Sequence, residues 1–136
     1  LTPAALNDPQ VRQEWINLKV QAMNKLMAEL MDEVRRYRPQ AKFARNIYPS
    51  AVLNPEAKAW LAQDYAAFFQ LYDYAVIMCY PALEKVPKPE RWLADLAQAA
   101  LAYPGAAERT VFKLQAYDWE KKRWIAPPVL KNKWQY

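Results

Sequence analysis

The chain has 136 residues, of which 54% are hydrophobic and 24% are charged. At about 100–200 residues per domain this length excludes a second domain, and the composition excludes a disordered chain. The formal net charge of +5 leaves two interpretations open: basic residues solvated at the ends of elements, which we favour, or a patch for nucleic acid.

Rare residue types limit the possible chemistry. The chain has no His, one Cys and one Gly. A zinc site needs about three or four ligands and Cys79 is the only thiol, so we expect no metal and no cofactor in this segment. No Ser-His or Cys-His pair can activate a nucleophile, and no glycine-rich loop can hold a phosphate. Carboxylates remain as the acid-base groups.

Targeting signals are not recognisable in the sequence. No apolar run approaches the ~18 residues of a membrane span, and the N-terminal residues lack the basic and apolar regions of a signal peptide. We therefore expect that any export signal has been removed. A single Cys says little about the compartment.

The first predicted element is a long helix. Asp8 and Pro9 supply a cap and a first-turn proline, apolar residues then recur at steps of three and four to Tyr37, and Pro39 ends the helix. A second apolar row predicts that the helix is covered on more than one side, with its methionines in the core. This row consists of Ile16, Val20, Met23, Met27 and Met31.

Strands and helices then alternate along the chain. Residues 41–48 predict a strand followed by a loop, and Asn54 caps a helix that runs to about Leu71. A continuous apolar run over 74–80, closed by Pro81, predicts an interior parallel strand that is buried on both faces. The later elements are a helix, a strand and the start of a fourth helix, over residues 87–101, 109–116 and 129–136.

The order of the elements defines the fold class. Strands that alternate with helices indicate parallel βαβ units, whereas a closed eightfold barrel takes ~250 residues. We therefore predict an α/β fold in which residues 1–136 form part of a (β/α)8 TIM-type barrel, about three βα units of a larger domain. A small open three-layer sheet is the alternative.

The loops differ in length at the two ends of the strands. Those that lead into strands are short, over residues 39–40, 72–73 and 104–108. Those that leave strands are long and rich in aromatic and charged residues, over residues 45–53, 80–88 and 117–128. Sites in parallel α/β folds form at the carboxyl ends of the strands, so we expect the functional site in the long loops.

The residues in these loops suit a sugar. Flat rings contact the C–H faces of a sugar, while amides, carboxylates and guanidinium groups exchange hydrogen bonds with its hydroxyls. Two alternatives stay open: rings that stack nucleobases beside basic residues, and rings that are core residues without their partner elements. The candidates are Arg45, Asn46, Tyr48, Tyr80, Glu84, Tyr117, Asp118, Trp119 and Trp124.

Three polar side chains among or beside these loops have two interpretations each. Glu84, just after the apolar strand, and Asp118, beside a tryptophan, are either acids of a site or ordinary surface carboxyl groups. Glycoside hydrolysis needs two carboxyl groups, ~5–5.5 Å apart for retention or ~6.5–9.5 Å apart for inversion. Gln115, near a strand end, points either into the site or into the interior.

Three segments resemble one known family. They are ARNIY (44–48), YDYAVIMCYPALE (72–84) and FKLQAYDW (112–119). Together they resemble the C-terminal domain of the periplasmic poly-β-1,6-N-acetylglucosamine N-deacetylases of Gram-negative biofilm bacteria. The similarity extends from about Asp8 to Trp119, with the segments in the order and at the spacing of the family.

The resemblance implies a carbohydrate-active enzyme. In that family a metal-dependent deacetylase domain precedes a (β/α)8-type domain, which binds the partially deacetylated polymer and hydrolyses it as an endo-acting glycosidase. Carried over by motif, Trp119 is the platform for a sugar ring. Glu84 and Asp118 are the acids on this side of the cleft. The family's principal acidic cluster lies on an earlier strand without a counterpart in this sequence. The other implied groove residues are Arg45, Tyr80 and Gln115.

The resemblance also implies partners and a location. The expected partner is poly-β-1,6-glucosamine/N-acetylglucosamine, in the periplasm and in association with the outer membrane and its export machinery; nucleic acid is not expected. The alternatives are a polysaccharide-binding module without hydrolysis and, further, a basic binder of single-stranded nucleic acid.

Overall fold

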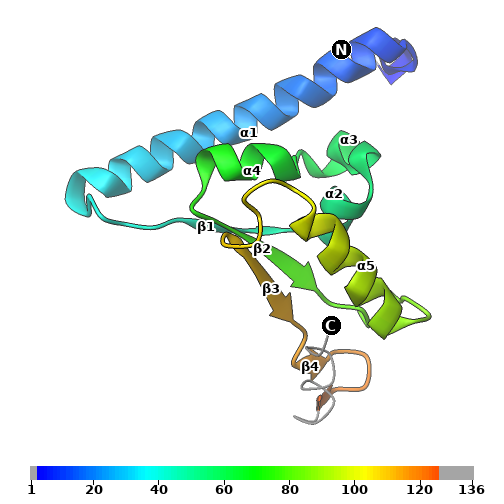
Figure 1. The fold of residues 1–136 in the computed structure, drawn as a ribbon. Helices are drawn as coiled ribbons and strands as arrows, with labels where there is room; N and C mark the ends of the chain where they lie inside the picture. The colour runs from blue at the N-terminus through cyan, green and yellow to red at the C-terminus, as the bar shows by residue number, and fades with distance from the viewer. Residues whose placement is uncertain (1–2, 126–136) are drawn as a thin grey trace.

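The computed structural model describes residues 3–125, and its centre is a three-stranded parallel sheet (Figure 1). The strands lie in the order β1–β2–β3, and helical segments connect each strand to the next. The predicted parallel βαβ arrangement is therefore confirmed. Each strand is shorter than predicted: β1 is Ala44–Ile47, β2 is Tyr74–Cys79 and β3 is Thr110–Leu114.

Helix α1 (Pro9–Tyr37) follows a short 3₁₀ helix, η1 (Pro3–Asn7), and begins where the sequence predicts. The Asp8 carboxylate accepts hydrogen bonds from the first-turn amides and satisfies donors that a helix start leaves open. The prediction that α1 is covered on more than one side is wrong for the described part of the chain, because only Ile16 and Met31 are buried. Its exposed apolar residues are Leu18, Leu26, Leu30, Val34 and Tyr37.

The prediction of one helix from Asn54 to about Leu71 is wrong, because the segment is divided into shorter helices. Ala62 adopts a left-handed conformation with φ of 51°, which no α-helix continues, and the Asp64 carboxylate then caps a new helix. The predicted loop after β1 also contains a helix, because Pro49 is suited to a first helical turn. The segments are α2 (Pro49–Leu53), η2 (Pro55–Ala57), α3 (Lys58–Leu61) and α4 (Tyr65–Leu71).

The core lies between the helices and one face of the sheet. Ala75, Ile77 and Cys79 alternate along β2 and are buried against α4 and α5 (Pro89–Leu101). On the other face Tyr74 is exposed, and Val76 and Met78 are only partly buried. β2 is the central strand, as predicted, but its predicted burial on both faces is wrong for residues 3–125. Figure 1 shows the helices gathered above and beside the strands.

After β3 the chain forms a small hairpin instead of the predicted loop. β4 (Tyr117–Asp118) pairs antiparallel with β5 (Arg123–Trp124). The loop pattern also differs from the prediction, because one residue joins β1 to α2 and longer segments lead into β1 and β3. The predicted helix over 129–136 lies outside the described residues. Within residues 3–125, no helix has both the length and the apolar character of a membrane span.

Candidate functional site

The carboxyl ends of β2 and β3 bring four aromatic side chains together. Tyr80 follows β2, and the other three belong to the hairpin after β3. The ring centroids of Tyr80 and Trp119 lie 5.8 Å apart, and those of Tyr117 and Trp119 lie 6.1 Å apart. Tyr117 and Trp124 meet edge to face at 5.3 Å. We call Tyr80, Tyr117, Trp119 and Trp124 the aromatic cluster.

Part of the cluster is exposed to solvent. Trp119 is 52% exposed, although it contacts two other rings. A large side chain that is held by neighbours and still half exposed is typical of a surface that contacts a ligand. Residues that sequence analysis singled out in two separate segments are thus brought into one place.

The turn of the hairpin is organised by Asp118. Its Oδ1 accepts hydrogen bonds from the backbone amides of Glu120 at 3.1 Å and Lys121 at 3.0 Å. Lys122 has a φ of 50°, and the Ile125 amide donates to the Ala116 carbonyl oxygen at 2.8 Å, which closes the base of the hairpin. Trp119 lies inside this turn.

Gln115 is buried beside Trp119 and lines a small cavity. Only 3% of the residue is exposed; its Nε2 donates to the Tyr117 carbonyl oxygen at 2.8 Å, and its Oε1 has no hydrogen-bond partner among the described residues. The cavity measures about 60 Å³. The sequence left open whether Gln115 points into the site or into the interior. In the structure its side chain is buried and borders the candidate site. The cavity is lined by Ala82, Leu83, Lys85, Gln115, Asp118, Trp119 and Glu120.

Lys85 and Glu120 are site residues that sequence analysis missed. Lys85 Nζ and a Glu120 carboxylate oxygen lie 3.9 Å apart, so the loop after β2 faces the hairpin after β3. Lys85 has a φ of 53° in that loop. Their positions in the predicted long loops 80–88 and 117–128 were the available signal. Glu84 itself is exposed, and within residues 3–125 no hydrogen bond or ion pair holds its carboxylate.

The three candidates of the first strand do not lie together. Arg45 Nη1 donates to the Tyr72 hydroxyl oxygen at 2.9 Å, and its guanidinium lies 5.4 Å from the Phe68 ring centroid, on the helical side of the sheet. Asn46 is exposed on the opposite face, because successive strand side chains alternate. Tyr48 follows the strand and is also exposed. The structure therefore separates Arg45 from the aromatic cluster.

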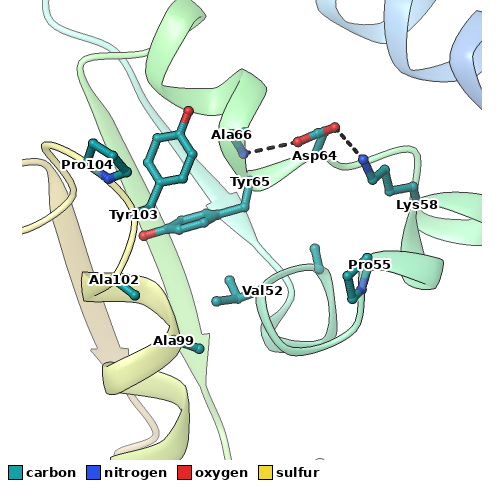
Figure 2. A pocket seen from close by; sticks show the side chains of 11 residues that line it. Val52, Pro55, Lys58, Asp64, Tyr65, Ala66, Ala99, Ala102, Tyr103 and Pro104 are labelled. Carbon is teal, nitrogen blue, oxygen red and sulfur yellow. Dashed lines mark hydrogen bonds and ion pairs between the residues drawn. The ribbon is translucent and has the colours of Figure 1, made fainter.

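A larger cavity of about 370 Å³ lies among the helices (Figure 2). Lys58 and Asp64 form an ion pair of 2.8 Å at its side. The Tyr65 hydroxyl makes a 2.9 Å hydrogen bond with Thr110 Oγ1, and burial raises the pKa of Tyr65. Because Lys58, Asp64 and Tyr65 in the lining of this cavity already have hydrogen-bond partners, we place the candidate site at the aromatic cluster.

The chemistry of the described residues is that of carboxylates and rings. No three His, Cys, Asp or Glu side chains gather in a geometry for a metal within residues 3–125. Burial raises the pKa of the Cys79 thiol to about 12, so it stays protonated at neutral pH. A nucleophilic thiol is therefore not available from Cys79.

Comparisons with known proteins connect this geometry to a family. A family model described as "Hypothetical glycosyl hydrolase family 13" matches residues 3–136. The poly-β-1,6-N-acetyl-D-glucosamine N-deacetylases of Escherichia coli K12 and O157:H7 are each 36% identical over 117 residues. The solved PgaB (BpsB) glycoside hydrolase domain from Bordetella bronchiseptica matches with a TM-score of 0.87 and 30% identity.

The matches differ in the share of each protein that they cover. The chain is covered to 84% by the E. coli proteins and to 96% by the Bordetella domain, but it spans only 17% and 37% of those chains. Three parallel strands connected by helices, which superpose on part of that domain, confirm the prediction of an α/β fold forming part of a TIM-type barrel. The chain belongs to the family described as hypothetical glycosyl hydrolase family 13.

Proposed function

We propose that residues 1–136 are part of a glycoside hydrolase domain that binds partially deacetylated poly-β-1,6-N-acetylglucosamine. The observation that carries this proposal is the aromatic cluster at the carboxyl ends of β2 and β3, with Trp119 half exposed. The E. coli relatives are named for this polymer, which supports the choice of substrate.

The cluster suits a pyranose ring. The C–H face of a sugar is apolar and fits the flat indole of Trp119, while the polar groups around it can exchange hydrogen bonds with hydroxyl and amide groups. Lys85 and Glu120 at the adjoining cavity are such groups. We therefore assign Trp119 as the sugar platform, with Tyr80, Tyr117 and Gln115 beside it.

Hydrolysis requires a complete domain. We propose endo-hydrolysis by two carboxyl groups, of which Glu84 is the candidate in this chain and the principal acid comes from strands that this chain does not contain. The parent protein then also carries the N-deacetylase activity for which the relatives are named. Its proposed location is the periplasm, beside outer-membrane export machinery.

The first test replaces Trp119 with Ala in the full-length protein. Loss of one stacked indole removes about 1–3 kcal/mol of binding free energy. We therefore expect calorimetry to show a ~5- to 150-fold weaker affinity for oligo-β-1,6-glucosamine/N-acetylglucosamine. Trp60→Ala is the matched control, because Trp60 is exposed on α3, outside the cluster. Equal affinity of the Trp119 variant and the wild type would exclude this function for the cluster.

A binding module without hydrolysis is the second candidate. The exposure of Glu84 and its lack of a holding partner within residues 3–125 favour it, because an acid catalyst is usually held in place. Product analysis of the digested polymer separates the two. Cleavage that is lost in Glu84→Gln supports the enzyme, and binding without cleavage supports the module.

A further inference from the structure

The carboxylate of Asp118 is engaged by its own hairpin. Oδ1 accepts from two backbone amides, at 3.1 Å from Glu120 and 3.0 Å from Lys121. Oδ2 lies 3.8 Å from Lys121 Nζ, and 15% of the side chain is exposed. Such a side chain that bonds the backbone two and three residues ahead is a local turn-forming device.

This engagement limits the use of Asp118 as an acid catalyst. A general acid has to deliver a proton to the leaving oxygen, and a nucleophile has to turn a lone pair to the sugar. Oδ1 already accepts from both amides of the turn, so only Oδ2, which lies 3.8 Å from Lys121 Nζ, is left for either action.

The residue that benefits from the turn is Trp119. It follows Asp118 directly and precedes both bonded amides, so the two hydrogen bonds span it. Outside the turn, its indole is positioned by ring contacts with Tyr80 and Tyr117 and is otherwise half exposed. Since half of this residue is free of contacts, a fixed direction of the ring also requires a fixed backbone.

We propose that Asp118 is a positioning residue that fixes the hairpin turn and thereby holds the Trp119 ring for the sugar. The role rests on the proposed function of the cluster as a sugar site. It requires the acceptor oxygen at Oδ1 and not the negative charge. Asn supplies the same oxygen and forms the same turn, whereas Ala does not.

The test compares Asp118→Asn and Asp118→Ala in the full-length protein. For Asp118→Ala we expect faster hydrogen exchange at the Glu120 and Lys121 amides. We also expect about fivefold weaker oligosaccharide binding, because the loss of a comparable side-chain cap from a helix changes the free energy by a similar amount. For Asp118→Asn we expect wild-type exchange, affinity and cleavage. Asp95→Ala, at an exposed carboxylate of α5, is the control.

Three results would overturn the proposal. They are unchanged amide exchange in Asp118→Ala, unchanged affinity in that variant when Trp119→Ala does lose affinity, and loss of cleavage in Asp118→Asn with affinity retained. The last result would make Asp118 catalytic. If Trp119→Ala keeps full affinity, the proposed sugar site fails, and amide exchange alone then decides whether Asp118 holds the turn.

Discussion

At the scale of single residues, Arg109 connects the start of β3 to the end of α4 and the two residues that follow it, far apart in the sequence. Its Nε donates to the Asp73 carbonyl oxygen at 3.1 Å, and its Nη2 donates to those of Phe69 at 2.8 Å and Tyr72. The guanidinium also lies 5.2 Å from the Phe69 ring centroid. It therefore satisfies carbonyl oxygens at the end of α4 and ties this end to the start of β3.

Arg109→Lys is expected to destabilise the fold although it keeps the charge. A lysine cannot reproduce the planar fork that reaches three carbonyl oxygens, and each lost hydrogen bond to a charged group costs about 1.5–3 kcal/mol. We expect the free energy of unfolding in urea to fall by about 2 kcal/mol. Arg91→Lys, at an exposed site of α5, should leave it unchanged; equal stability of both variants would refute the role of Arg109.

At the scale of elements, α4 depends on the cap at its first turn. The Asp64 carboxylate accepts from the Ala66 and Ala67 amides and pairs with Lys58. Burial alone would raise the pKa of Asp64, but the hydrogen bond and charge of Lys58, together with the two amides, hold it below its ordinary value. The cap is what restarts a helix after the left-handed Ala62.

Asp64→Ala should cost about 1 kcal/mol of unfolding free energy at pH 7. Because the folded pKa is lowered, the contribution of the carboxylate is complete above the unfolded pKa of about 3.9 and is lost as the pH falls through the folded value. In urea unfolding measured from pH 7 to pH 2, the difference in unfolding free energy between the variant and the wild type should narrow below about pH 4. A difference that does not change with pH would contradict the contribution of the Asp64 charge. Asp32→Ala is the exposed control.

At the scale of the whole molecule, the sheet is covered on one side. In residues 3–125 the helices bury one face, while Tyr74 and Val111 are exposed on the other, and β1 and β3 each pair with a single strand. Parallel sheets normally have both faces covered, and unpaired edges invite further strands. This arrangement is that of one sector of a barrel whose inner face the remaining strands close.

The 136-residue chain on its own is therefore expected to bind the dye ANS and to associate as its concentration rises. Exposed apolar surface and open strand edges drive both processes. The double variant Tyr74→Lys and Val111→Lys should reduce dye fluorescence, whereas Trp60→Lys on α3 should not. A monomer in sedimentation at high concentration, without dye binding, would exclude an open inner face.

The sequence by itself determined the parallel strands of the central sheet and the helices α1 and α5, but not the β4–β5 hairpin. Asp8 before Pro9, the apolar run of β2 and the proline at the start of α5 are local signals, and each predicted its element correctly. Such signals depend on neighbours a few residues away, and so the parallel βαβ order and the region of the aromatic cluster could be predicted.

Only the tertiary structure decided which surfaces are buried and where the site side chains point. A one-residue change of register moves a strand side chain to the opposite face. The sequence therefore left the direction of Gln115 open and predicted Arg45 in the groove, whereas the structure places Arg45 against Tyr72 and Phe68. The two-residue strands β4 and β5 are too short for any periodicity, and their pairing, which presents Trp119, depends on side-chain to backbone bonds from Asp118. These features arise from contacts that only the folded backbone brings within reach.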